Sequence, residues 1–142
     1  MSHHPLPSEP LVAAVSQCHV PSSAILSQSI AFEQIADAPL IFIPRQVAPA
    51  YFDIVADYYA VHGKSLRIYQ EAIQMQTIIG LVAAGLGISL VPGSMTEMSR
   101  KGVHYLSLEG PTPTVETCMI WKGDGDQPAL QSFLDLLDPA VR

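Results

Sequence analysis

The chain has 142 residues, 49% of them hydrophobic, and a net charge of −6 at pH 7. This length suits one compact domain and is too short for two complete ones, and the hydrophobic content excludes a disordered chain. The excess of acids disfavours direct nucleic-acid binding, because a polyanion is repelled on average.

Residues 1–10 lack the basic start and the apolar run of a secretory signal, so they are expected to be a loose terminus. Cys18 and Cys118 stand far apart, without CxxC or His-rich spacing. We therefore expect two reduced, partly buried thiols in a cytoplasmic protein, with neither a metal site nor a disulfide framework.

The first predicted element is a short buried strand at residues 11–15, an apolar run closed by polar residues. Residues 18–29 read as a loop rich in serine, and residues 32–35 as a short helix. Residues 40–44 form a second apolar run that ends at a proline and predicts another buried strand.

The next predicted element is a helix that begins near Pro49, since proline suits the first helical position, and ends at Gly63. Asp53 and Asp57 would face water on this helix. Its inward face would carry Tyr51, Phe52, Val55, Tyr58 and Tyr59. A strand is expected to follow at residues 66–69.

Residues 72–96 contain no charged side chain, which raises the question of a membrane span. A span needs about 20 apolar residues in one helix, but Gly80, Gly85, Gly87 and Pro92 interrupt this stretch. It therefore reads as the interior of a soluble domain, with a helix that Gly85 ends and a strand at residues 88–91.

The remaining chain predicts a short helix at residues 93–100 and strands at 103–108 and 115–121. A last helix would have Asp126 as its N-cap and Pro128 in its first turn. Its apolar face would consist of Leu130, Phe133, Leu134 and Leu137. Strands and helices that alternate in this order predict an α/β fold with a largely parallel sheet covered on both faces.

Ligands of such sheets bind beyond the carboxyl ends of the strands. Three segments qualify: Pro44–Arg45–Gln46, Ala72–Ile73–Gln74 and Pro92–Gly93–Ser94. Arg45 is the one Lys or Arg before Lys64, and it lies between a strand end and a helix start, where it could bind an anion. It could equally pair with a nearby carboxylate or face water.

Catalytic and cofactor motifs are weak or missing in the sequence. No GxSxG turn and no phosphate-binding glycine loop is present, and neither His62 nor His104 has a neighbouring nucleophile. The adjacent pair Cys18–His19 is a poor candidate for a thiolate–imidazole pair. We expect no enzyme activity, no cofactor and no metal.

The phrase LVAAGLGISLVP resembles the effector-binding domain of LysR-type transcriptional regulators. SEPLVAAVSQCHV, FEQIADAPLIFIPR, RIYQEAIQMQTI and VETCMIWKGD resemble further parts of that domain. The resemblance extends from about Glu9 to the C-terminus. IFIPRQVAPAYFD is similar in particular to the branch of the family that responds to breakdown products of aromatic compounds.

The resemblance implies a periplasmic-binding-protein-like fold with a three-layer αβα sheet and a small-molecule cleft between two subdomains. The second subdomain would span residues 17–110, and residues 11–16 and 115–142 would supply crossing strands and the C-terminal helix. The resemblance also implies dimers, and the similarity to the aromatic-responsive branch implies an effector that is often a small carboxylate. Carried over to this chain, the cleft wall would consist of Pro44, Arg45, Gln46, Ala72, Ile73 and Gln74.

The winged-helix DNA-binding domain of the family and the opening part of its first subdomain have no counterpart before Glu9. Two functions from different classes follow. The first is an effector-binding module for a small carboxylate, expected to form homodimers and not to contact DNA or a membrane itself. The alternative is a stand-alone module for protein–protein interaction or dimerisation, in which an uncovered apolar surface pairs with another chain.

Overall fold

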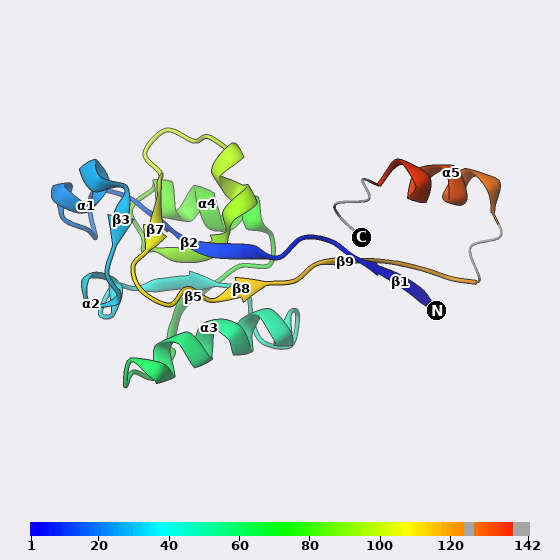
Figure 1. Cartoon of the computed structure of the whole chain (residues 1–142). Coiled ribbons are helices and arrows are strands. Elements are labelled where there is room, and N and C mark those ends of the chain that lie inside the picture. Colours follow the sequence, from blue (N-terminus) through cyan, green and yellow to red (C-terminus); the bar gives the residue numbers. More distant parts are fainter. Residues whose placement is uncertain (124–126, 138–142) are drawn as a thin grey trace. The chain divides into compact units, whose positions relative to one another are not determined.

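The computed structural model describes residues 1–123 and 127–137. These residues form two compact units (Figure 1). The larger unit is Pro10–Val115, and the smaller one combines Met1–Glu9 with the chain from Glu116 onward.

The larger unit alternates strands with helices. Its strands are β2 (Glu9–Val15), which starts at the boundary, β3 (Ser29–Ile30), β4 (Leu40–Phe42), β5 (Ile68–Glu71), β6 (Ser89–Pro92), β7 (His104–Leu108) and β8 (Thr114–Val115). Its helices are α1 (Ser22–Ser27), α2 (Phe32–Ile35), α3 (Pro49–Val61), α4 (Met75–Ala83) and the 3-10 helix η1 (Gly93–Glu97).

Strand β2 lies between β6 and β7 and runs antiparallel to both. On the outer side of β7, β3 runs parallel to it, and β4 and β5 form a separate parallel pair. A parallel bridge between Leu40 and Ile88 joins this pair to the chain at the start of β6. The predicted parallel arrangement therefore holds except at β2, because an apolar run indicates burial but not strand direction.

Side chains of β2 alternate between the two faces of the sheet, as the period of a strand requires. Leu11, Ala13 and Val15 pack into the cluster that contains residues of α3. Val12 and Ala14 point to the opposite face, where they meet Ile79 of α4. Figure 1 shows α3 and α4 on opposite sides of the sheet, which confirms the three-layer αβα architecture.

Helix α3 forms where the sequence predicts it. Pro49 is its first residue, and Val55, Tyr58 and Tyr59 are buried, while Asp53 and Asp57 are exposed. Gly63 follows the helix with φ +77°. Its N–H donates to Ala60 O, and the next N–H, of Lys64, donates to Tyr59 O at 3.0 Å, which is the Schellman pattern of helix ends.

The uncharged stretch folds as a helix and a strand inside this unit, as predicted. Ile78, Ile79 and Val82 of α4 are buried, and Gly85 ends the helix with φ +82°. The next strand, β6, has Ser89, Leu90 and Val91 buried. In the described part of the chain, no helix is both long and apolar enough to cross a membrane.

Two segments expected to lack regular structure contain it. Residues 18–29 were predicted as a loop, but they include α1 and the start of β3. Residues 1–10 were predicted to be loose, but they contain strand β1 (Ser2–Pro5), which pairs antiparallel with β9 (Cys118–Trp121). The backbone of β1 finds partners more than a hundred residues away, and local sequence carries no signal for such pairing.

The C-terminal third also differs in detail from the prediction. The expected strand at 115–121 is two strands, β8 and β9, which lie in different units. The short helix expected at 93–100 ends at Glu97, before Arg100. The last helix, α5 (Pro128–Leu136), forms with Gln127 as its N-cap, and Asp126, the predicted N-cap, lies outside the described residues.

The backbones of Gly87 and Pro39 lie so close together that a side chain at residue 87 would not fit. A Cβ added at Gly87 would overlap Pro39 O and lie 3.2 Å from Ile41 Cγ1. We expect Gly87→Ala to lower the free energy of unfolding by about 3 kcal/mol, the upper range for overpacking.

Gly110 provides the control, because its φ is +79° but its Cβ would meet open space. Gly110→Ala should cost only backbone strain, about 1 kcal/mol. Urea unfolding monitored by circular dichroism measures both values. Equal losses in the two variants would show that the contact at Pro39 does not constrain the fold.

Candidate functional site

The carboxyl ends of β4 and β5 meet at one edge of the larger unit. Phe42 pairs in register with Glu71, and the N–H of Ala72 donates to Phe42 O at 3.1 Å. The segments 44–46 and 72–74, which follow these strands, therefore begin side by side, as the sequence predicts.

The segment after β4 turns at once into helix α3. Pro44 is buried, and its carbonyl accepts a hydrogen bond from Val47 N at 3.0 Å, which closes the turn. The N-cap of α3 is Ala48, which has no side chain that can cap the helix, and the first turn contains no acidic residue. The partial positive charge of this helix end is thus not compensated from within the helix.

The segment after β5 starts helix α4 in the same way. Gln74 is the N-cap, its side chain makes no capping hydrogen bond, and no acidic residue lies in the first turn. Two helix N-termini without capping side chains therefore follow the neighbouring strand ends. Free N–H groups at such positions favour anions.

Arg45 lies between β4 and α3 and forms a two-point ion pair with Asp53. Its Nε and Nη2 donate to Oδ1 and Oδ2 of Asp53, both at 3.1 Å. The two side chains are more than half exposed, so water screens the pair and its contribution to stability is small. Of the two roles that the sequence left open for Arg45, pairing with a carboxylate is the one the structure contains.

The pair with Asp53 orients Arg45 and leaves part of it unused. The hydrogen bonds that Arg45 donates to Asp53, and then the charge of Asp53, raise the pKa of Arg45 above its ordinary value. A guanidinium has five N–H donors, and Asp53 takes one on Nε and one on Nη2. The Nη1 and Nη2 edge keeps three donors, and this edge matches a second carboxylate.

The remaining predicted site residues divide into two groups. Ala72, Ile73 and Gln74 line an open groove of about 670 Å³ together with Glu71 and Thr77. Arg45 and Gln46 are exposed and do not line that groove. Because Glu71 places a negative charge in the groove, an anionic group is favoured on the side of Arg45, and an apolar group beside Ile73.

Sequence reasoning missed two residues that shape this edge. Asp53 is exposed as predicted, but its pairing with Arg45 was not predicted. Arg45 lies outside the helix, so its separation of eight residues from Asp53 gives no sign of a contact. Tyr51 packs against the core as predicted, and its hydroxyl also donates to Leu90 O of β6, which ties the start of α3 to the sheet. Burial raises the pKa of Tyr51, so it remains a donor.

The weak catalytic candidates of the sequence do not assemble into a reactive group. His19 Nε2 lies 2.8 Å from Gly85 O, so this nitrogen faces a backbone carbonyl. Cys18 and Cys118 are both free, and both are exposed where the sequence predicted partial burial. Within residues 1–123 and 127–137, no three His, Cys, Asp or Glu side chains gather in a way that could hold a metal ion.

A family model described as the LysR substrate binding domain matches residues 1–142. The chain belongs to this family. It is 44% identical over 137 residues to the HTH-type transcriptional regulator IlvR of Caulobacter vibrioides, an alignment that covers 96% of this chain and 44% of that regulator. It is 34% identical over 130 residues to the HTH-type transcriptional regulator CatR of Pseudomonas putida, covering 91% of this chain and 43% of the other.

Solved structures of LysR-type proteins share the fold. The BenM effector-binding domain, solved with its effector benzoate, has a TM-score of 0.69 at 24% identity, over 94% of this chain and 60% of that one. CbnR, a LysR-family transcriptional regulator, has a TM-score of 0.75 at 20% identity, over 94% and 45%. The periplasmic-binding-protein-like fold that the resemblance implied is thereby confirmed.

This LysR-type domain spans less than half the length of the curated regulators that it matches. The resemblance inferred from LVAAGLGISLVP and the other phrases is confirmed at the level of the family. The six site residues carried over from that resemblance stay a prediction, because similarity of sequence and fold does not identify which side chains touch a ligand.

The pairing of Arg45 with Asp53 gives a prediction that needs no ligand. In Asp53→Asn the two-point carboxylate contact is lost, so the Arg45 Nε–H should exchange faster with water and its NMR signal should broaden. Asp57→Asn, one turn further along α3, is the matched control and should leave the signal sharp. A signal that is equally sharp in both variants would show that Asp53 does not hold Arg45.

Proposed function

We propose that this chain is an effector-binding module of a LysR-type transcriptional regulator and that it binds a small, aromatic-derived carboxylate. The carboxylate would lie at the edge formed by the ends of β4 and β5. The observation that carries the proposal is the oriented Arg45 guanidinium before α3, at an edge where β4 and β5 both lead into helices that have neither capping side chains nor acids in their first turns.

Charge decides which kind of ligand suits this edge. The chain carries a net charge of −6, so an anion needs a local positive field, and the free edge of Arg45 with the two helix ends supplies one. The exposed side chain of Ile73 and the half-buried Ala72 offer an apolar surface beside it. A flat carboxylate such as benzoate, the effector in the BenM structure, meets both requirements.

The proposed roles follow from these positions. Arg45 would hold the carboxylate through Nη1 and Nη2, and Gln46 and Gln74 would act as polar partners that adapt to the ligand. Pro44, Ala72 and Ile73 would contact its apolar body. No step of this binding requires a cofactor or a metal, and the module would act in the cytoplasm together with the DNA-binding part of a regulator.

Binding at this edge is tested by thermal shift with millimolar benzoate. A ligand at about 100 times its dissociation constant adds roughly 2.7 kcal/mol of stability, which raises the melting temperature by roughly 8 °C. Arg45→Gln should remove most of the shift and leave the melting temperature of the free protein nearly unchanged, because the pair with Asp53 is exposed.

Two controls sharpen that test. Benzamide keeps the shape of the ligand but lacks the charge, and it should give little shift. Arg100→Gln removes a cation elsewhere in the same unit and should respond to benzoate like the unchanged protein. An undiminished benzoate shift in Arg45→Gln would exclude Arg45 as the anion contact.

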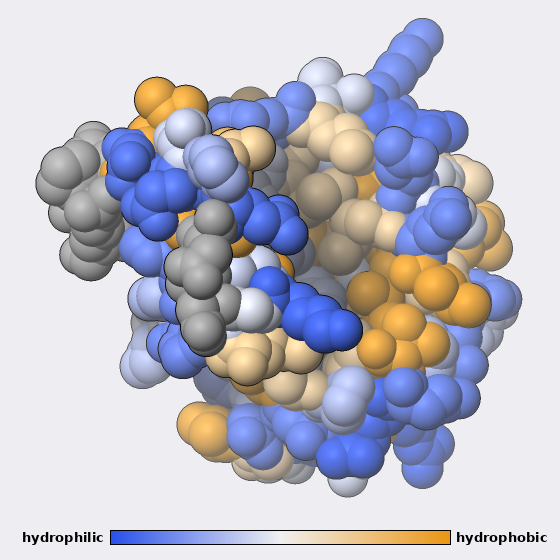
Figure 2. Space-filling model, turned by 90° about the vertical axis from the view of Figure 1, so that its right-hand side faces the viewer, coloured by the Kyte–Doolittle hydropathy of each residue, from blue (hydrophilic) through white to orange (hydrophobic). Residues whose placement is uncertain are grey.

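We also propose that the smaller unit is covered by a second copy of the chain. Its described elements are β1, β9 and α5, and none of its described residues is buried. Phe133 and Leu136 of α5 are 51% and 81% exposed, and hydrophobic residues are visible as orange groups on the surface in Figure 2. Two strands and one helix do not form a stable core alone, so association would shield these side chains.

Light scattering after size exclusion tests this association. The unchanged protein should be a dimer or larger at micromolar concentration, and Phe133→Asp should shift it toward the monomer because the charge cannot be buried without a partner. Ser132→Asp, at a neighbouring exposed position of α5, is the control and should keep the assembly. A protein that is monomeric throughout would contradict the proposal.

A further inference from the structure

A second groove lies at the opposite end of the β4–β5 pair. It has a volume of about 670 Å³ and lies between the chain that leads into β4 and the chain that leads from α3 into β5. Leu40 and Ile68, the paired first residues of these strands, line it. The proposed effector edge begins beyond Phe42 and Glu71, the last residues of the same strands, so the two places are separate.

The end of helix α3 shapes one wall of this groove. Gly63 takes a left-handed conformation, and the Lys64 N–H donates back to Tyr59 O at 3.0 Å. This bond fixes the backbone of Lys64 beside Tyr59. The chain then continues through Ser65 and Arg67 into β5. The residues of this segment that line the groove are Tyr59, Lys64, Ser65 and Arg67.

Positive charge is concentrated in the groove although the chain is acidic. Lys64 and Arg67 line it, against one acid, Asp37. Lys64 Nζ lies 3.5 Å from Asp37 Oδ1, and both side chains are at least half exposed. This ion pair is therefore weak, and a ligand carboxylate can take the place of Asp37 beside Lys64. Arg67 has no ion-pair or hydrogen-bond partner among the described residues, and its guanidinium is therefore available.

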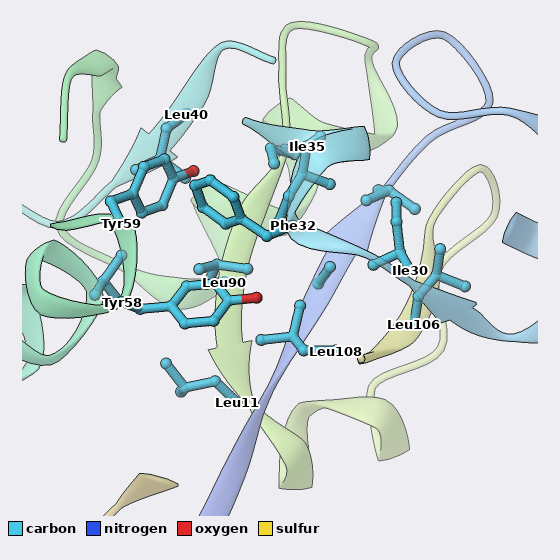
Figure 3. Packing of buried hydrophobic residues seen from close by; sticks show 14 of the residues in the cluster. Leu11, Ile30, Phe32, Ile35, Leu40, Tyr58, Tyr59, Leu90, Leu106 and Leu108 are labelled. Atoms are coloured by element: carbon cyan, nitrogen blue, oxygen red, sulfur yellow. The ribbon is translucent and has the colours of Figure 1, made fainter. Parts of the chain in front are cut away.

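Tyr59, one of the residues that line the groove, has a buried hydroxyl without a partner among the described residues. Tyr59 is 3% exposed, and its hydroxyl has no hydrogen bond within the described structure. Figure 3 shows its ring between Phe32 and Leu40, a residue that lines the groove. Burial raises the pKa of Tyr59 to about 12, so the hydroxyl keeps its proton and can act only as a donor to an anion.

We propose that this groove is a second ligand site, which binds a small aromatic carboxylate through Arg67 and Lys64. The Tyr59 hydroxyl donates a third hydrogen bond when the ligand carboxylate reaches it. The apolar body of the ligand lies against Tyr69, whose side chain is 70% exposed, and against Ile68. A buried donor without a partner costs free energy, and the ligand relieves that cost.

The chemistry of the walls favours an organic anion over inorganic phosphate. Two cations suffice for a single negative charge, whereas the apolar contact offered by the Tyr69 ring and Ile68 stabilises an organic ligand and not a bare phosphate ion. The site does not depend on Arg45, which is at the other end of the strands. Failure at one site therefore does not imply failure at the other.

A titration of the ¹⁵N-labelled chain with benzoate, followed by NMR, separates the two sites. We expect saturable shifts at Ser65 and Ile68 that persist in Arg45→Gln. In Arg67→Gln these shifts should require about tenfold more benzoate or disappear, since a charge-assisted hydrogen bond is lost. The shifts near Gln46 and Gln74 should be unchanged in Arg67→Gln.

Tyr59→Phe tests the buried donor. It removes only an unpaired hydroxyl, so the melting temperature should not fall, while benzoate binding at the groove should weaken several-fold. Arg100→Gln is the matched cation control and should bind as the unchanged protein does. Melting curves of all variants verify that they are folded.

Three results would overturn the proposal. One is a set of groove shifts that is undiminished in both Arg67→Gln and Lys64→Gln. Another is an equal response to benzamide, which would show that charge does not matter. The third is an equal response to inorganic phosphate, which would show that the apolar walls take no part.

Discussion

The contact between the Pro39–Ile41 backbone and the chain at Gly87–Ile88 determines where every site of this domain lies. Ile41 N donates to Ile88 O, and Ile88 N donates to Pro39 O, both at 2.8 Å. These two bonds join the β4–β5 pair to the sheet built on β2, and the approach is possible because residue 87 has no side chain. Without this junction, the β4–β5 pair would not be held to the sheet that contains β2 and β6.

The position of Arg45 depends on the same junction through α3. The hydroxyl of Tyr51 bonds to Leu90 O of β6, so the first turn of α3 is fixed to the sheet, and Asp53 follows at the start of the next turn. Arg45 then pairs with Asp53 from the segment before the helix. An exposed arginine is thus oriented by a chain of contacts that begins in the core, which reduces the entropy lost when a ligand binds.

The sequence predicted the elements that carry the proposed effector site, and it did so for physical reasons. The apolar run at 40–44, Pro49 at a helix start, and Gly63 and Gly85 at helix ends are local signals, and α3 and α4 form accordingly. Parallel pairing of β4 with β5 follows from the alternation of strands and helices, and it brings Arg45 and Gln74 to one edge.

Contacts between residues that are distant in the sequence could not be predicted in the same way. The antiparallel direction of β2, the pairing of β1 with β9 and the bond between Arg45 and Asp53 all depend on tertiary structure, which periodicity does not report. The groove at Tyr59 was missed for a similar reason, because an unpaired buried hydroxyl can be recognised only when its surroundings are known.

The central claim is that a carboxylate binds to the free edge of Arg45, and a crystal structure of the protein with benzoate tests it most directly. The account predicts the carboxylate within hydrogen-bonding distance of Arg45 Nη1 and Nη2, with the ring against Ile73 and the bonds from Nε and Nη2 to Asp53 retained. A structure in which benzoate is bound elsewhere, while Arg45 contacts Asp53 alone, would contradict the account.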